Sequence, residues 1–338
     1  MALLAGARFA LGALALAAVI GAPHGAHAQA VTQEAYPERK IPFPGRVISY
    51  PDVTYSSVPG YRPLKLDLYV PATRGPHPLV IYVHGGGWVG GQPRLAGTIV
   101  DFPSTLAAIA ARGYTVASVS YRLSGEARFP AAIQDVKTSI RWLRANAAKY
   151  AIDPERALIW GSSAGGQLAA LAGTSCGVAD VAPQLPANSP LASQSDCVQG
   201  VILWYPVTDF ETITAQTAAL GIAPPPGGGA AGGPNQYLGC APAACLPVAR
   251  WASPIDYVDA KDPPFLIFHG DIDKTVPVAQ SQTFSEALTK AGVKTELVVV
   301  PGMDHSFITA DGKPSPETNK MALDKMAVFI DQTIGAKR

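Results

Sequence analysis

The sequence has few charged side chains, since Asp, Glu, Lys and Arg together make up 15% of its 338 residues. The two signs nearly cancel, giving a formal net charge of +1, and the lysines and arginines form no basic run. Proteins that bind nucleic acid or anionic membranes through charge need such a basic patch, so neither partner is expected. Hydrophobic residues make up 48%, which excludes a disordered chain and favours one large globular domain.

Long apolar runs are also scarce, and the clearest one lies near the N-terminus. Arg8 supplies a positive charge, the apolar run Phe9–Ile20 follows it, and the small-x-small triplet Ala26–Ala28 comes just before Gln29. This order predicts a secretory signal peptide over residues 1–28. An uncleaved membrane anchor is the alternative, but the run is short for a membrane span. The mature protein is therefore expected to have no membrane span and to be secreted or periplasmic.

Cysteine is rare, and the four residues are Cys176, Cys197, Cys240 and Cys245. An even number of cysteines in an oxidising compartment indicates two disulfides. Of the three pairings that four cysteines allow, Cys176–Cys197 and Cys240–Cys245 are favoured, because each pair brackets a loop-like stretch. Four unpaired thiols are the alternative. A zinc site is disfavoured because the cysteines lack CxxC spacing and have no histidine near them.

Apolar runs of strand length recur through the rest of the sequence. Leu79–Val83 is typical of a strand buried on both faces of a parallel sheet, and apolar residues recur every three or four positions within Ala131–Tyr150, as in a helix. Strands that alternate with helices predict a doubly wound α/β fold with a mostly parallel sheet. The other expected strands are 46–55, 64–70, 115–120, 157–160, 201–204, 265–268 and 297–300, and the other expected helices are 165–172, 278–291 and 316–334.

Some stretches lack these patterns. Residues 29–45 show no periodicity and are expected to form a poorly ordered leader, which leaves 46–338 for the α/β domain. Within that domain, the polar stretch 174–198 and the stretch 211–250 are expected insertions. The second begins as a possible helix and then becomes rich in Gly, Pro and Ala. Long irregular insertions often cover an active site, and a surface decoration without a catalytic role is the alternative.

The segment Gly161–Gly166 reads Gly-Ser-Ser-Ala-Gly-Gly and lies between an expected strand and an expected helix. A G-x-S-x-G pattern in that setting is a nucleophile elbow, a turn so sharp that its central residue takes a strained backbone conformation. The central residue is Ser163 rather than Ser162, so Ser163 is the predicted nucleophile. The strand–turn–helix setting carries this interpretation, because the short pattern alone also occurs by chance.

A second motif, the glycine loop His84–Trp88, reads His-Gly-Gly-Gly-Trp and directly follows an expected strand. Acyl transfer places negative charge on a carbonyl oxygen, and consecutive glycines expose backbone N–H groups that can stabilise that charge. Gly86 and Gly87 are the predicted donors of this oxyanion hole, together with the N–H of Ala164. Trp88 leaves the assignment open by one residue and is itself a candidate substrate contact. A generic glycine turn is the alternative.

The catalytic base is found by elimination among the histidines. His77 sits between prolines, His84 belongs to the glycine loop and His269 closes a strand, whereas His305 lies in a loop between the last expected strand and the last expected helix. His305 is therefore the predicted base, and a surface histidine is the alternative. Hydrolases with this elbow place their acid between the serine and the histidine in the sequence. The stretch 269–277 offers two aspartates in that position.

These motifs together resemble the HGGGW-type α/β-hydrolases, bacterial esterases related to hormone-sensitive lipase and to the acetylxylan/feruloyl esterases. The resemblance covers about residues 60–335 and is carried by His84–Trp88, Tyr121–Leu123, Arg141–Leu143, Gly161–Gly166 and His269–Pro277. It implies the α/β-hydrolase fold and a triad of Ser163, Asp273 and His305, with Asp273 preferred to Asp271. It also implies a reaction without a metal or other cofactor.

Ser162 departs from the family pattern, because typical relatives of hormone-sensitive lipase have Asp at this position. This difference, and a leader too short for the N-terminal helical cap of the lipase group, move the resemblance toward the acetylxylan/feruloyl esterases. The expected function is a secreted serine carboxylesterase acting on small-molecule or polymer-linked esters of acetyl, feruloyl, short aliphatic or polyester type. A serine amidase, arylformamidase or peptidase is the alternative, and a non-catalytic binding module is a remote one. The sequence carries no signal for an oligomeric state.

Overall fold

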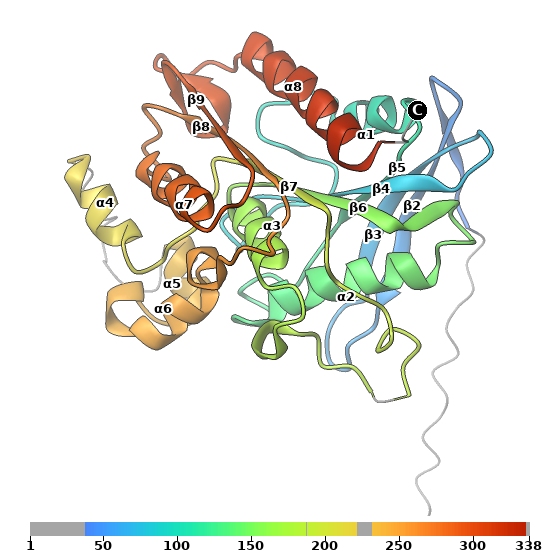
Figure 1. The fold of residues 1–338 in the computed structure, drawn as a ribbon, viewed down its shortest axis with the longest axis horizontal. Helices are drawn as coiled ribbons and strands as arrows, with labels where there is room; N and C mark the ends of the chain where they lie inside the picture. Colours follow the sequence, from blue (N-terminus) through green and yellow to red (C-terminus); the bar gives the residue numbers. More distant parts are fainter. Residues whose placement is uncertain (1–37, 187, 222–231, 336–338) are drawn as a thin grey trace, which may run out of the picture. The chain divides into compact units, whose positions relative to one another are not determined.

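The computed structural model describes residues 38–186, 188–221 and 232–335, so the predicted signal peptide, residues 1–28, lies outside the described part. In the described residues a nine-stranded sheet has the order β1-β2-β3-β5-β4-β6-β7-β8-β9 (Figure 1). Its strands are β1 Ile41–Phe43, β2 Val47–Ser56, β3 Leu64–Pro71, β4 His77–Val83, β5 Thr115–Val119, β6 Ile152–Ser162, β7 Gly200–Trp204, β8 Phe265–Gly270 and β9 Thr295–Val300. A small hairpin pairs β10 Met303–Asp304 with β11 Ile308–Thr309.

Strand direction divides the sheet into two parts. The pairs β1–β2, β2–β3 and β3–β5 are antiparallel, whereas every pair from β5 through β4, β6, β7 and β8 to β9 is parallel. The central parallel strands β4, β5, β6, β7 and β8 are buried along most or all of their length, as expected of strands covered on both faces. The predicted mostly parallel sheet of an α/β-hydrolase fold is therefore confirmed.

Helices cover both faces of the sheet. They are α1 Phe102–Ala111, α2 Ala131–Ala145, α3 Ala164–Thr174, α4 Ile213–Ala219, α5 Gly233–Leu238, α6 Leu246–Ala252, α7 Ala279–Lys290 and α8 Pro316–Ile334. Successive strand residues point to opposite faces. Ile81 accordingly belongs to the core cluster with α2, α3 and α7, whereas Tyr82 belongs to the cluster with α1 and α8. Figure 1 shows α1 and α8 on one side of the sheet and α2 and α3 on the other.

Helix α1 is absent from the sequence-based expectations, because its small and hydroxylated residues give a weak amphipathic pattern. Its start is nonetheless well specified, since the Asp101 side chain accepts a hydrogen bond from the backbone N–H of Ser104 at 3.1 Å. Phe102 and Leu106 are buried against the sheet. Tertiary packing of these side chains therefore stabilises a helix that its sequence pattern signals only weakly.

The predicted poorly ordered leader, residues 29–45, is wrong for its described part. Strand β1 pairs antiparallel with β2, with Ile41 opposite Ser49. Before it, Glu38 forms an ion pair with Lys149 at 3.0 Å and accepts a hydrogen bond from the Tyr150 hydroxyl at 2.9 Å. A three-residue strand is too short to show periodicity, and its partners become visible only in the folded chain.

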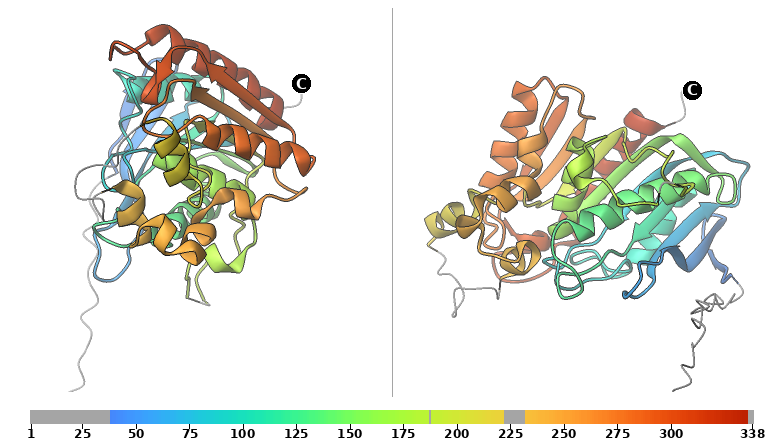
Figure 2. Two further views of the ribbon diagram at one scale, coloured as in Figure 1. Left: turned by 90° about the vertical axis from the view of Figure 1, so that its left-hand side faces the viewer. Right: turned by 90° about the horizontal axis from the view of Figure 1, so that it is seen from below.

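Both predicted insertions carry a disulfide, and both favoured pairings, Cys176–Cys197 and Cys240–Cys245, are confirmed. The possible helix expected at the start of 211–250 corresponds to α4, and the part of that stretch expected to be irregular also contains α5 and most of α6. These short helices gather next to α7 in the views of Figures 1 and 2. An ion pair between Glu211 and Arg250, at 2.6 Å, joins the two ends of that stretch.

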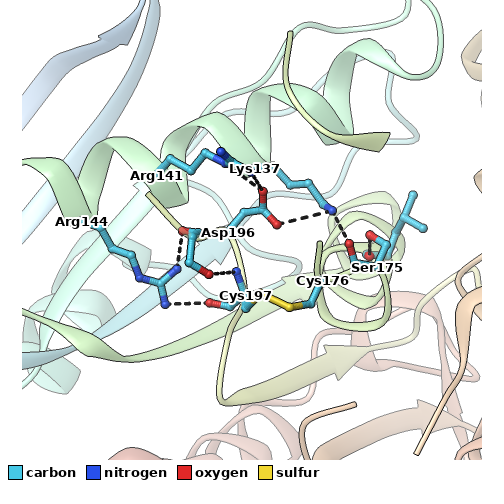
Figure 3. Close-up of a disulfide and its surroundings, with 9 residues drawn as sticks. Lys137, Arg141, Arg144, Ser175, Cys176, Asp196 and Cys197 are labelled. Atoms are coloured by element: carbon cyan, nitrogen blue, oxygen red, sulfur yellow. Dashed lines mark hydrogen bonds and ion pairs between the residues drawn. A yellow bond between two sulfur atoms is a disulfide. The ribbon is translucent and has the colours of Figure 1, made fainter. Parts of the chain in front are cut away.

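A buried cluster of charges fixes the other insertion, 174–198, to α2 (Figure 3). Lys137 is completely buried; its Nζ donates to the carbonyl oxygen of Ser175 at 2.5 Å and lies 3.6 Å from Asp196 Oδ1. Arg141 donates to Asp196 Oδ2 at 2.6 Å, and Arg144 donates to the Cys197 carbonyl oxygen at 2.7 Å. Burial lowers the pKa of Lys137, and the Asp196 carboxylate partly opposes this. Asp196 is therefore the carboxylate that pairs with Lys137 and Arg141 in this cluster.

Replacing Asp196 with alanine is expected to lower the free energy of unfolding by about 3–5 kcal/mol, because Lys137 is left buried without its counter-charge. Urea unfolding under non-reducing conditions, which keep the disulfides intact, measures this. Asp180→Ala in the same insertion is the matched control. Asp180 is exposed, so its removal should change the free energy by less than about 0.5 kcal/mol. Equal effects of the two substitutions would contradict a structural role for the buried cluster.

Candidate active site

The candidate site is a cavity of ≈ 390 Å³ at the carboxyl ends of the central parallel strands. In doubly wound sheets this edge is the usual place for a ligand, because the loops that follow the strands converge there. The cavity is lined by His84, Gly85, Gly86, Gly87, Gly91, Gln92, Leu95, Gly97, Ser162, Ser163, Tyr205, Thr275, His305 and Ser306. The glycine loop, the elbow and the loop of the predicted base thus meet in one place.

The elbow has the strained geometry that its sequence predicts. Strand β6 ends at Ser162, α3 begins at Ala164, and Ser163 between them has φ +54° and ψ −120°. A Cβ on Gly161 would lie 2.1 Å from the carbonyl oxygen of Gly165, and one on Gly165 would lie 2.1 Å from the carbonyl oxygen of Val83. Only glycine fits at either position, so the local sequence forces this turn and presents Ser163 to the cavity.

Ser163, His305 and Asp273 form one hydrogen-bonded chain. Ser163 Oγ lies 3.0 Å from His305 Nε2, and His305 Nδ1 lies 2.8 Å from Asp273 Oδ2. A carboxylate can only accept, so the proton sits on Nδ1 and leaves Nε2 free to accept the serine proton. Asp271 is exposed and accepts a hydrogen bond from the N–H of Gly302. Of the two aspartates, the structure therefore brings Asp273 to the histidine.

Asp273 is held as a carboxylate by its surroundings. Its Oδ1 accepts hydrogen bonds from the N–H groups of Thr275 and Val276, both at 2.8 Å. Burial opposes ionisation, but hydrogen bonds from His269 and His305 outweigh it and hold the pKa of Asp273 well below its usual range. His269 Nε2 lies 3.3 Å from Asp273 Oδ2. The sequence predicted only a structural role for His269 at the end of a strand. In the structure His269 also contacts Asp273.

The glycine loop brings its backbone to the same cavity. Gly86 and Gly87 have φ +113° and +61°, and a Cβ on Gly85 would lie 2.8 Å from the carbonyl oxygen of Ser162. The loop therefore packs directly on the elbow. Within the described part of the chain, the N–H groups of Gly86 and Gly87 donate no hydrogen bond. Ala164, the third predicted donor, is the first residue of α3.

His84 is part of the framework of this loop, as expected from the sequence. Its ring stacks on Tyr121, with centroids 4.4 Å apart, and its Nδ1 lies 2.8 Å from the Gly85 carbonyl oxygen. Burial lowers the pKa of His84 to about 4. The ring is therefore neutral at physiological pH and its Nδ1 proton holds the loop.

Trp88, the candidate substrate contact, does not line the cavity. Its side chain is 2% exposed, its Nε1 donates to Gln167 Oε1 at 3.0 Å, and its ring stacks on Tyr237 at 4.6 Å. The prediction of a substrate contact is wrong because the positive φ of Trp88, +60°, accompanies a side chain that packs behind the glycine loop. Its partners Gln167 and Tyr237 are far from it in the sequence, so this packing could not be predicted from the local motif.

Tyr205 is a cavity residue that sequence reasoning missed. It directly follows β7, has φ +40° and places its ring 4.7 Å from the His305 ring, edge to face. Burial raises the pKa of Tyr205, so its phenol stays protonated. Its position at the carboxyl end of a central strand was the available signal, because that edge of the sheet holds the site.

Two further observations describe the chain around this site. None of the described helices is long and apolar enough to cross a membrane. Across residues 38–186, 188–221 and 232–335, no group of three or more His, Cys, Asp or Glu is arranged to hold a metal ion.

Comparison with known proteins agrees with the fold and the motifs. The BD-FAE family matches residues 66–288, and the prolyl oligopeptidase family matches residues 242–337. Esterase LipC of Mycobacterium tuberculosis is 33% identical over 256 residues, which cover 73% of this chain and 58% of LipC. Esterase LipQ of the same organism is 30% identical, over 85% of this chain and 64% of LipQ. The chain thus spans about three fifths of the length of these relatives.

Solved structures give the same picture. A truncated carbohydrate esterase from gut microbiota has a TM-score of 0.69 at 29% identity, over 85% of this chain and 96% of that one. Esterase 2 of Thermogutta terrifontis with bound butyrate has a TM-score of 0.65 at 26% identity, again over 85% and 96%. The family match covers well over half of this chain, and it includes the elbow and the glycine loop. The chain therefore belongs to the BD-FAE family of α/β-hydrolases.

Proposed function

We propose that this protein is a serine carboxylesterase in which Ser163 is the nucleophile, His305 the base and Asp273 the acid of the triad. The observation that carries the proposal is the chain of hydrogen bonds from Ser163 to His305, at 3.0 Å, and on to Asp273, at 2.8 Å. Ser163 and His305 line a cavity that the glycine loop also lines. A nucleophile, a base and oxyanion donors around one cavity are the parts that acyl transfer requires.

The geometry supports a two-step reaction. His305 Nε2 takes the proton from Ser163 as its Oγ attacks the ester carbonyl carbon, and the carbonyl oxygen becomes an oxyanion. The N–H groups of Gly86, Gly87 and Ala164 stabilise this charge. The protonated His305 then gives its proton to the departing alcohol, leaving an acyl-enzyme. Water repeats the sequence, releases the acid and restores Ser163.

Short acyl groups suit this cavity best. A volume of ≈ 390 Å³ lies at the lower end of the range for small-molecule sites, and its lining includes the bulky Tyr205 next to His305. Relatives point the same way, since one solved esterase holds butyrate and another is a carbohydrate esterase. Acetyl or similarly small esters, free or attached to a polymer, are therefore the proposed substrates.

Secretion is part of the same proposal. The predicted signal peptide, residues 1–28, is the first reason to propose secretion. The disulfides Cys176–Cys197 and Cys240–Cys245 support it independently, because disulfides persist in oxidising compartments. Fractionation of expressing cells, with the mass of the mature N-terminus, tests this. A cytoplasmic protein that retains Met1 would overturn it.

Hydrolysis of p-nitrophenyl esters from acetate to palmitate tests the esterase proposal. Turnover should be highest for the short chains and fall steeply for the long ones. A folded protein that hydrolyses none of these esters would disprove the proposal.

A second candidate, a serine peptidase or amidase, is favoured by the match of residues 242–337 to the prolyl oligopeptidase family. The corresponding p-nitroanilides measure it, and faster turnover of anilides than of esters would favour that candidate.

Activity is expected to fall on acidification through the range in which histidines protonate. Protonation of His305 Nε2 removes the acceptor for the serine proton. Asp273 does not contribute to this loss, because its pKa is held well below its usual range by hydrogen bonds from His269 and His305 that outweigh its burial. The plot of kcat/KM against pH should therefore show a single-proton acid limb. A rate that stays flat well below the histidine range would contradict His305 as the base.

A further inference from the structure

The insertion after β7 reaches the back of the glycine loop. Gly233, the first residue of α5, packs with its backbone directly against Gly87: a Cβ on Gly233 would lie 2.7 Å from the Gly87 carbonyl oxygen and 3.3 Å from its Cα. Real Cβ atoms essentially never come this close to a backbone atom. Any side chain at position 233 must therefore shift the start of α5 and Gly87, one of the proposed oxyanion donors, apart.

A second contact from the same helix lies beside the first. The ring of Tyr237 stacks on Trp88 with centroids 4.6 Å apart and planes inclined by 9°, and both side chains are almost completely buried. The carbonyl oxygen of Tyr237 accepts a hydrogen bond from the N–H of Phe129 at 2.8 Å, which anchors α5 to the segment before α2. Trp88, the residue after Gly87, is thus also held in place by α5.

A third contact links Trp88 to α3, the helix that begins directly after Ser163. Gln167 of α3 is completely buried; its Oε1 accepts from Trp88 Nε1 at 3.0 Å, and its Nε2 donates to the carbonyl oxygen of Ala252 at 2.8 Å. One side chain therefore joins the glycine loop, α3 and the end of α6. The helices α5 and α6 hold the position of the loop relative to Ser163 as well as its shape.

We infer that residues 233–252 are a positioning element for the oxyanion hole, which acts through Gly233 on Gly87 and through Tyr237 on Trp88. This inference rests on the proposed function, because it assigns these residues to the stabilisation of the oxyanion. Oxyanion donors must lie within hydrogen-bond distance of a charge that exists only in the transition state. A displaced Gly87 N–H therefore lowers kcat far more than it raises KM. None of the residues 233–252 needs to contact the substrate.

Two neighbouring glycines make the test specific. A Cβ on Gly232 meets no atom of the described residues within 4 Å, and the φ of Gly232, −81°, suits alanine. Gly233→Ala is therefore compared with Gly232→Ala as its matched control. Gly233→Ala should lower kcat for p-nitrophenyl acetate by at least about tenfold, with little change in KM, since loss of a single oxyanion donor costs about 10²–10³. Gly232→Ala should behave like the wild type.

The rate of labelling by a fluorophosphonate gives a readout that does not depend on ester turnover, because Ser163 displaces fluoride through a charged phosphorus intermediate at the same N–H donors. Gly233→Ala should slow labelling by a similar factor, with an unchanged thermal unfolding midpoint. Equal kcat and labelling rates for the two alanine variants would overturn the inference and leave the esterase proposal intact. A wild type that labels but turns over no ester would disprove the esterase proposal, and the labelling rates of the two variants would still decide the inference. Failure of the wild type in both assays would overturn both.

A second pair of variants covers the case in which Gly233→Ala does not fold. Tyr237→Leu removes the ring that stacks on Trp88 and should lower kcat and the labelling rate by several-fold. Tyr237→Phe keeps the ring and should restore both toward the wild type. A purely structural role would affect stability alone, so the two variants would then share the wild-type kcat, and that result would also overturn the inference.

Discussion

Replacing Ser163 with alanine is expected to lower kcat/KM for p-nitrophenyl acetate by about 10⁴-fold or more, because removal of the nucleophile leaves only binding and the oxyanion hole. The fold should be unaffected. Alanine keeps the Cβ, so the strained φ of +54° at this position persists without new contacts, and the thermal unfolding midpoint should stay near that of the wild type. Steady-state kinetics on freshly purified protein measure the loss.

Ser162→Ala is the matched control for that variant, because the two serines are neighbours in the elbow. Ser162 Oγ lies 3.0 Å from the Tyr82 hydroxyl rather than beside His305. Its removal should reduce kcat/KM by at most about tenfold, the cost of one lost buried hydrogen bond. If Ser162→Ala were the inactive variant and Ser163→Ala retained turnover, the assignment of the nucleophile would be wrong.

Replacing Asp273 with asparagine is expected to lower kcat/KM by about 10⁴-fold while the geometry stays nearly the same. The amide oxygen can keep the hydrogen bonds from the N–H groups of Thr275 and Val276. Its NH₂ group then faces His305 Nδ1, where the carboxylate accepted a hydrogen bond at 2.8 Å. Two donors cannot pair, so the histidine takes the other tautomer and its protonated Nε2 cannot accept from Ser163.

Asp271→Asn provides the control, since Asp271 lies two positions away and is exposed. Its side chain accepts a hydrogen bond from the N–H of Gly302 at 2.7 Å, and asparagine can replace that acceptor. Activity should stay within about twofold of the wild type, as for most surface substitutions. Comparable losses in both variants would mean that the acid acts through the loop rather than through His305.

Local sequence was enough for those parts of the protein that short-range sterics dictate. The elbow follows from glycines at 161 and 165, since each has a backbone carbonyl within 2.1 Å of where its Cβ would be. The central strands follow from continuous apolar runs, which only a sheet covered on both faces can bury. The choice of Asp273 over Asp271 came from family resemblance, and the structure gives its physical reason: Asp273 is buried beside His305, whereas Asp271 is exposed.

Long-range contacts account for what the sequence did not predict. Strand β1 exists because β2 is available to pair with it, and α1 because the sheet buries its apolar side chains. Trp88 was misassigned for the same reason, since its ring is buried by Tyr237 and Gln167, residues far from it in the sequence. Tyr205 reaches the base only because β7 and the loop of His305 end at the same edge.

By itself the sequence determined the α/β sheet and the strained serine, because each depends on residue types at short spacing. It also predicted His305 as the base and the two disulfide pairings that the structure contains. Tertiary structure decided which aspartate faces His305, where Trp88 lies, and that residues 233–252 support the glycine loop. Those outcomes depend on distances between segments that are remote along the chain. Such distances are set by how whole layers pack, and no local pattern encodes them.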